Sequence, residues 1–91
     1  MNTIKTLFLL FNQITFAQKI KYFAKIADSS YSAKNYQFAT DNYLQEIKIT
    51  DFNSKKASLF YNMACCQSLQ NKTDEAIAYL KESIKLGYSN K

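Results

Sequence analysis

Apolar and polar residues follow a helical period through the second half of the chain. From Phe60 to Leu86 the sequence reads FYNMACCQSLQNKTDEAIAYLKESIKL, and its apolar residues recur at helical spacing on both sides of a polar interruption at 70–72. This spacing gathers apolar side chains on one side of a helix. The pattern therefore predicts two amphipathic helices joined by a short turn, one from about Lys55 to about Leu69 and one that follows Thr73 and ends at about Leu86.

A weaker copy of this pattern lies upstream at a fixed offset of 37 residues, the separation of Phe23 and Phe60. The same shift matches Ile26 with Met63, Ala27 with Ala64, Ala39 with Ala76, Tyr43 with Leu80, Ile47 with Ile84 and Ile49 with Leu86. A fixed offset that preserves side-chain size is typical of stacked helical repeats. The upstream copy is expected to form helices over about 20–33 and 36–49.

The matched apolar and small positions are those that a packed pair of helices buries. Small residues let two helices approach closely, and large ones fill the space beside them. The residues predicted to hold the helices together are Phe23, Ala27, Ala39, Tyr43, Phe60, Ala64, Ala76 and Leu80. Ile77 and Ile84 are expected to face inward from the last helix with Leu80.

Polar residues and the single glycine mark the expected helix ends. Asn53 or Ser54 is expected to cap the third helix, and Thr73 to cap the fourth, because their side chains accept hydrogen bonds from free amides. Gly87 follows the fourth helix and is expected to adopt the left-handed conformation that ends many helices.

Composition favours an all-α fold in one domain. The 91 residues include no proline and one glycine, so the signals that separate short strands are nearly absent. Seven tyrosines and seven phenylalanines supply ring area for a core. The formal charge of +5 comes from lysines scattered among acidic residues. This distribution favours a solvated surface over a nucleic-acid-binding stripe.

The first residues follow the plan of a secretory signal peptide. Lys5 precedes an apolar run over residues 7–11, and Phe16 and Ala17 precede Gln18. The run is too short to cross a bilayer, which needs about 20 residues. We expect a signal peptide over 1–17, a mature chain over 18–91 with no membrane span, and a secreted or periplasmic location. The alternative is a first helix or an uncleaved anchor.

The residues needed for most catalytic and metal sites are missing. The chain has no histidine, which excludes Ser-His and Cys-His pairs. Cys65 and Cys66 are neighbours on a helix, so their side chains diverge by about 100°, which disfavours a disulfide between them and matches no zinc spacing. Small buried hydrophobic residues are the expectation, and an exposed cysteine that pairs between chains is the alternative. Asp74 and Glu75 suit the start of a helix better than acid–base chemistry. We therefore expect no enzyme activity, no catalytic residue, no metal and no cofactor.

The two helix pairs resemble the tetratricopeptide repeat (TPR), most strongly over YNMACCQSLQNKTDEAIAYLKESIKLGY. That family places a small residue on each helix of a pair, which Ala27 with Ala39 and Ala64 with Ala76 match. Its usual period is 34 residues, and the additional residues here fall between Ile49 and Ala57. The likeness is to small secreted or envelope TPR proteins of Bacteroidetes-type bacteria. It implies a short α-solenoid, with repeat one over about 20–52 and repeat two over about 55–88.

The resemblance also implies a concave groove lined by the first helix of each pair. The residues at the family's groove positions, which are expected to bind a partner, are Lys21, Ala24, Asp28, Tyr31, Ser58, Tyr61, Cys65 and Ser68. Tyr31 and Tyr61 are the expected anchors, because aromatic residues contribute much of the energy at interfaces. Burial of these tyrosines in the core is the alternative.

Two functions fit these expectations. The first is a module that binds a peptide or a protein surface in the groove. The second is a structural part of a larger assembly: a homodimer, a self-associating subunit, or the N-terminal module of a larger envelope protein or enzyme. Two repeats bury little surface and solenoids usually have three or more, so the second function predicts apolar side chains exposed on the last helix.

Overall fold

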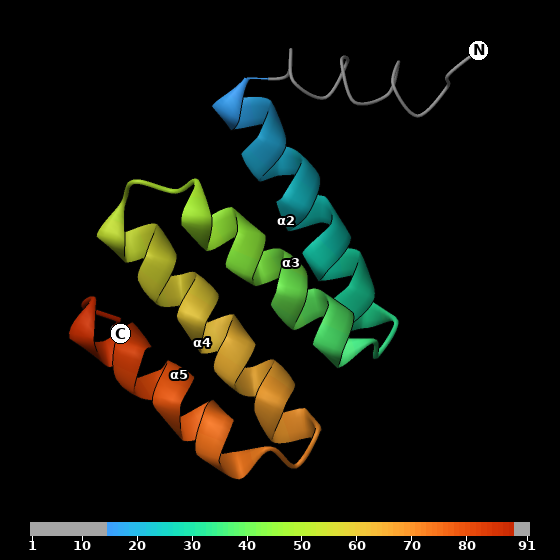
Figure 1. The fold of residues 1–91 in the computed structure, drawn as a ribbon, viewed down its shortest axis with the longest axis vertical. Helices are drawn as coiled ribbons and strands as arrows, with labels where there is room; N and C mark the ends of the chain where they lie inside the picture. Colours follow the sequence, from blue (N-terminus) through green and yellow to red (C-terminus); the bar gives the residue numbers. More distant parts are fainter. Residues whose placement is uncertain (1–14, 89–91) are drawn as a thin grey trace.

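The computed structural model describes residues 15–88 and shows four helices, α2 (Phe16–Ser32), α3 (Tyr36–Lys48), α4 (Asn53–Leu69) and α5 (Thr73–Lys85) (Figure 1). No strand occurs among these residues. The prediction of an all-α fold is therefore confirmed over this part of the chain.

Each helix packs against the next one in the sequence. Contacts join α2 to α3, α3 to α4, and α4 to α5, and successive helices run in opposite directions (Figure 1). The four helices consequently form a row, with α2 at one end and α5 at the other. This order leaves the two terminal helices with fewer neighbours than the two central ones.

The helix bounds repeat at the same offset as the sequence pattern. α4 begins 37 residues after α2 (53 against 16), and α5 begins 37 residues after α3 (73 against 36). The first helix of each pair has 17 residues and the second has 13. The two pairs are therefore equivalent in length and position, residue for residue.

The turns within the two pairs are also equivalent. Lys34 (φ 65°) and Asn71 (φ 61°) are both left-handed and lie 37 positions apart. The N–H of Lys34 bonds to the carbonyl of Tyr31, and the N–H of Asn71 bonds to that of Ser68, at 3.0 and 2.9 Å. The N–H of the next residue in each turn, Asn35 or Lys72, bonds to the carbonyl of Ser30 or Gln67, which completes a Schellman motif. Gly87 (φ 99°) ends α5 in the same way, as predicted.

The core lies between the first helix pair and α4. Its buried members come from α2, α3 and α4: Ala27, Ala39, Tyr43, Leu59, Met63 and Cys66. Ala27, Ala39, Met63 and Cys66 have no exposed surface. Small residues are thus among the most buried positions, and Leu59 and Met63 belong to the same cluster.

Two predicted caps are wrong. α4 begins at Asn53 and α5 at Thr73, so neither residue precedes its helix. Phe52 and Lys72 occupy the cap positions, and neither side chain makes a capping hydrogen bond. At α5 the preceding turn explains the difference. Lys72 is the last residue of the Schellman motif, and its carbonyl already accepts the first helical hydrogen bond, from the N–H of Ala76. Both helices begin with backbone bonds alone.

The predicted start of the first helix, Ile20, is four residues late. Thr15 accepts from the N–H of Gln18 at 3.2 Å, and the Gln18 side chain accepts from the N–H of Thr15 at 2.9 Å. This capping box starts α2 at Phe16. The predicted boundary between Ala17 and Gln18 therefore falls in the first turn of α2. Residues 1–14, which carry the rest of the signal-peptide prediction, lie outside the described residues.

Three apolar residues predicted to face inward from α5 are exposed instead. The exposed fractions are 47% for Ile77, 38% for Leu80 and 60% for Ile84. The physical reason is position in the row: among the described residues, no helix packs on α5 in the way that α4 packs on α3.

Candidate binding groove

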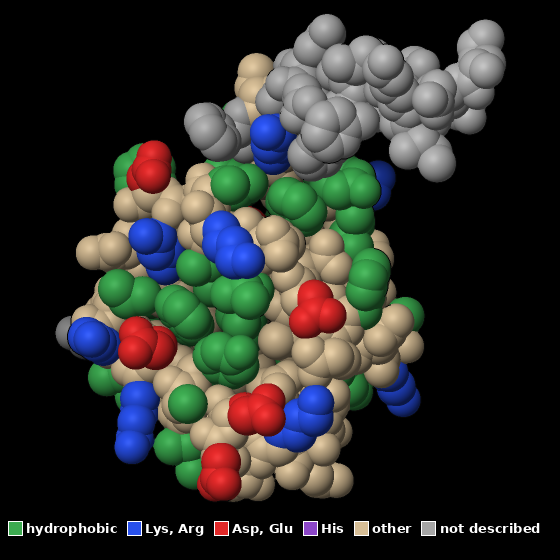
Figure 2. Space-filling view, viewed as in Figure 1, with side chains coloured by type: hydrophobic (Ala, Val, Ile, Leu, Met, Phe, Trp, Pro, Cys, Tyr) green, Lys and Arg blue, Asp and Glu red, His purple; other side chains and the backbone are tan. Residues whose placement is uncertain are grey.

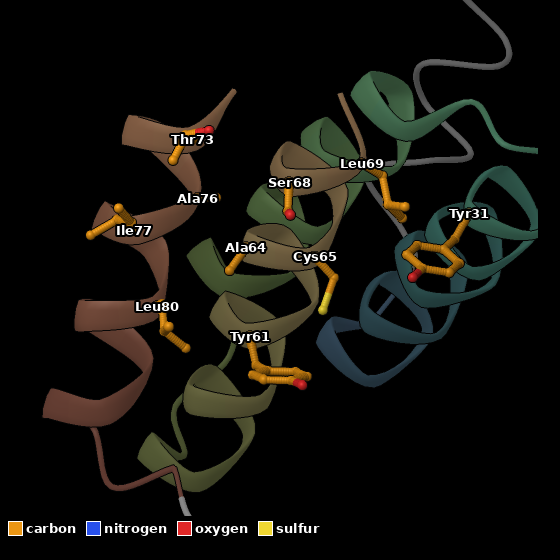
Figure 3. A pocket seen from close by; sticks show the side chains of 10 residues that line it. All are labelled: Tyr31, Tyr61, Ala64, Cys65, Ser68, Leu69, Thr73, Ala76, Ile77 and Leu80. Atoms are coloured by element: carbon orange, nitrogen blue, oxygen red, sulfur yellow. The ribbon is translucent and has the colours of Figure 1, made fainter. Parts of the chain in front are cut away.

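A cavity of about 490 Å³ lies across α2, α4 and α5. α2 contributes Tyr31, and α4 contributes Tyr61, Ala64, Cys65, Ser68 and Leu69. The remaining wall consists of Thr73, Ala76, Ile77 and Leu80 from α5. Figure 3 shows α4 between the other two helices, with Ile77 pointing outward from α5. We call this cavity the groove.

The groove is apolar and carries no formal charge. Its ten lining residues include no acidic or basic side chain, and its polar groups are hydroxyls and one thiol. Charged side chains lie elsewhere: on the face seen in Figure 2, lysines and acidic residues alternate around a central group of hydrophobic side chains. The groove therefore suits an uncharged, largely apolar ligand surface.

Two tyrosines are held in place by neighbouring rings. Tyr31 packs edge-on against Tyr36, the first residue of α3, with ring centroids 5.5 Å apart and planes at 72°. Tyr61 stacks on Tyr88 at 4.5 Å with nearly parallel planes (4°). Tyr31 is half-buried, and Tyr61 is 36% exposed. Each ring therefore presents a fixed surface to the groove.

Both phenols stay protonated at neutral pH. Burial is the main cause that raises the pKa of Tyr31, and the neighbouring cysteines add to it. Cys65 and then Tyr88, which become negative when they ionise, raise the pKa of Tyr61. Each hydroxyl can therefore donate one hydrogen bond to a ligand carbonyl while its ring makes apolar contacts.

The structure brings half of the predicted partner-binding residues together. Tyr31, Tyr61, Cys65 and Ser68 all line the groove. The other four lie outside it: Lys21, Ala24, Asp28 and Ser58.

The four residues outside the groove have other positions or partners. Asp28 accepts a hydrogen bond from the Tyr43 hydroxyl at 2.9 Å, and Ser58 donates to the Ser54 carbonyl at 3.3 Å. Lys21 and Ala24 belong to the first half of α2, whereas only Tyr31 near its end reaches the groove. Sequence spacing identifies the side of a helix, but it does not say how far along that side the neighbouring helix reaches.

The predicted packing residues divide between core and groove. Ala27, Ala39, Tyr43 and Ala64 are buried. Phe23 and Phe60 are half-buried, and Phe60 stacks on Tyr79 of α5 with centroids 6.1 Å apart. Ala76 and Leu80 line the groove and are half-buried and 38% exposed, respectively, because the last helix has no further neighbour among the described residues.

A buried amide that the sequence did not reveal connects three helices. Gln67 of α4 is 1% exposed. Its Oε1 accepts from Thr40 of α3 at 3.1 Å and from Gln70 at 3.0 Å, and its Nε2 donates to Glu75 of α5. Gln67 lies one turn after Met63, on the buried side of the predicted helix, and this spacing is the sequence feature that indicates its burial. This network fixes both helix pairs behind the groove.

The two cysteines are free thiols in different surroundings. Cys66 is fully buried, and burial is the main cause that raises its pKa, so it remains a neutral thiol. Cys65 is half-buried at the groove. In the described part of the chain, no three His, Cys, Asp or Glu side chains cluster as metal ligands would.

Between residues 15 and 88, no helix combines the length and apolar character that a membrane span requires. Comparisons with protein-family models, curated proteins and solved structures find no match to this chain.

Proposed function

We propose that this chain is a short α-solenoid of two TPR-like repeats that binds a segment of a partner protein in the groove. The groove itself carries the proposal. It has the size of small-ligand and peptide-anchor sites, which are about 300–1,000 Å³, and combines an apolar lining with a few hydroxyl groups. The 37-residue repetition of helix bounds and turns supports the solenoid.

The lining defines the chemistry of the ligand. An apolar or aromatic side chain inserted between Tyr31, Tyr61 and Leu69 would lose its hydration without facing a charge. The backbone carbonyl groups of the peptide beside this side chain could accept hydrogen bonds from the two phenol hydroxyls. The proposed ligand is therefore a peptide segment with an aromatic or branched aliphatic anchor and no charge at the anchor position.

Binding fits this groove better than catalysis. Cys65 is the strongest nucleophile type in the lining, but the chain contains no histidine to activate it. The hydroxyls of Ser68 and Thr73 have no acid or base among the lining residues. We accordingly propose a non-enzymatic protein that works without a metal or a cofactor.

The test begins with a random peptide library selected on the full 91-residue chain. Selected peptides should carry an uncharged apolar anchor, and Tyr61→Ala should weaken their binding about tenfold or more, since truncating an aromatic hot spot costs about 2 kcal/mol. Phe38→Ala is the matched control, because Phe38 is a half-exposed aromatic residue outside the groove. Equal binding to wild type and to both Tyr31→Ala and Tyr61→Ala would refute the groove.

Export stays part of the proposal and has its own test. The sequence pattern over residues 1–17 supports a cleaved signal peptide. Expression of the whole chain in a bacterium, followed by mass spectrometry of the envelope fraction, should give a product that starts at Gln18. A product found only in the cytoplasm at full mass would contradict export.

A further inference from the structure

One face of α3 is covered by α4, and the equivalent face of α5 is open. On α3, Thr40 and Tyr43 are 3% and 4% exposed. The residues 37 positions later on α5 are Ile77 and Leu80, at 47% and 38%. Ile84, the equivalent of Ile47, is 60% exposed, whereas Ile47 packs against the core. The open face is therefore more apolar than the covered one.

The fold itself shows which kind of element fits this face. α4 covers α3 as an antiparallel helix and presents Leu59, Met63 and Gln67 at a spacing of i, i+4 and i+8. Leu59 and Met63 belong to the same buried cluster as Tyr43, and Gln67 accepts a hydrogen bond from Thr40. A helix with apolar residues at these positions would fit α5 in the same way.

α2 is the copy of α4, and Tyr22, Ile26 and Ser30 are the equivalents of Leu59, Met63 and Gln67. Ser30 is buried and donates its hydroxyl to the Ile26 carbonyl, so the surface that α2 presents consists of the exposed Tyr22 and the half-buried Ile26. Tyr22 is 51% exposed, although Leu59 is 2% exposed, and it is held edge-on by Phe23 with centroids 5.4 Å apart. α2 and α5 lie at opposite ends of the row, so one copy of the chain carries both halves of a possible contact (Figure 1).

We propose that α5 of one copy binds α2 of a second copy, which repeats the α3–α4 contact between molecules. Tyr22 then packs against Ile77, Leu80 and Ile84. The two surfaces differ, so the contact is head-to-tail and leaves an unused α2 and an unused α5 at the ends of every pair. Association therefore continues beyond the dimer as concentration rises.

Charge sets the salt dependence of this contact. Lys25 lies on α2 beside Tyr22, Lys81 and Lys85 lie on α5, and each copy has a formal charge of +5. Added salt screens this repulsion and strengthens the contact. The contact goes beyond the proposed binding function, but it uses Ile77 and Leu80, which also line the groove, so association and peptide binding compete for this part of α5. Tyr22 and Ile84 lie outside the groove, so variants at these two residues test association without replacing a groove residue.

Sedimentation of two full-length variants tests the proposal. Tyr22→Glu blocks the α2 surface, and Ile84→Glu blocks the α5 surface; both residues are exposed, and circular dichroism checks that the helices remain. The wild-type mass should rise with concentration from 10.5 kDa past the dimer. Each variant alone should stay monomeric, whereas an equimolar mixture should form a 1:1 dimer and stop there. Phe38→Glu should associate like the wild type.

Three results would overturn the proposal. The first is a wild-type chain that stays monomeric throughout. The second is self-association of Tyr22→Glu alone, which would indicate an α5–α5 contact. The third is a mixture of the two variants that remains monomeric. These sedimentation results can still be interpreted if the peptide selection fails, because none of them depends on a ligand.

Discussion

Replacing one alanine in each helix pair by leucine should destabilise the pair whose interface is closed and should leave the pair with an open side nearly unchanged. Ala39 and Ala76 occupy equivalent positions on α3 and α5, 37 residues apart. Ala39 has no exposed surface and lies in the core, whereas Ala76 is half-buried and lines the groove. Replacing each by leucine adds the same atoms to the same helix position, and the two substitutions are controls for each other.

The expected difference follows from packing. At Ala39 three additional carbon atoms must enter space already filled around Tyr43 and Met63, and overpacking of this kind costs about 1–3 kcal/mol. At Ala76 the same atoms extend into the groove, so the expected cost is close to zero. Alanine and leucine differ little in helix propensity, which leaves packing as the main term.

Urea denaturation followed by circular dichroism measures both variants. In a domain of this size a loss of 1 kcal/mol lowers Tm by about 4–8 °C, so thermal unfolding gives a second readout. Dilute protein keeps association through α5 out of the measurement. Equal destabilisation by Ala39→Leu and Ala76→Leu, or a larger loss at Ala76, would refute the view that the second pair has an open side.

Three further predictions concern buried polar groups and thiols. Gln67→Leu should lower the free energy of unfolding by about 1 kcal/mol, because it removes the hydrogen bonds that join α4 to Thr40 and Glu75. Gln45→Leu, on exposed surface, should change it little, and similar losses from both would argue against the network. Under native conditions a thiol reagent should label the half-buried Cys65 and spare the buried Cys66, so that Cys65→Ser abolishes labelling; native labelling that survives this substitution would contradict the assignment. Glu46 is 1% exposed, and burial is the main cause that raises its pKa above the usual 4.5, although Lys55 Nζ lies 3.5 Å from Oε2 and partly offsets the shift. Because the ionised form is disfavoured in the folded state, the stability of wild type relative to Glu46→Gln should fall as pH rises through about 4.5 and above, and a rising difference would contradict this sign.

The helices and their pairing follow from the sequence because both depend on local spacing. The 37-residue offset between Phe23 and Phe60 predicts equivalent pairs, and the observed bounds of α2 and α4 differ by that number. Errors at the helix ends have local causes. The capping box of Thr15 with Gln18 is a pattern that the sequence itself contains. The direct entry of Lys72 into α5 depends instead on a turn geometry that propensities do not specify.

Only half of the predicted partner-binding residues line the groove, and the reason differs from the one at the helix ends. Helical spacing correctly places Tyr31, Tyr61, Cys65 and Ser68 on a shared side. Whether the apolar residues of α5 line the groove depends on whether another helix packs against them. An apolar residue such as Leu80 follows the same helical spacing in both cases. The sequence therefore predicts an apolar side for α5, and only the order of helices in the row shows that this side is exposed.

The central claim is that a peptide segment binds in the groove, and amide NMR spectra of the labelled chain test it most directly. Titration with a selected peptide should shift the signals of Cys65, Ser68, Leu69 and Ala76 together, and should leave Phe38 on α3 in place. Shifts that cluster around Phe38 instead, or that spread evenly over all four helices, would contradict the account.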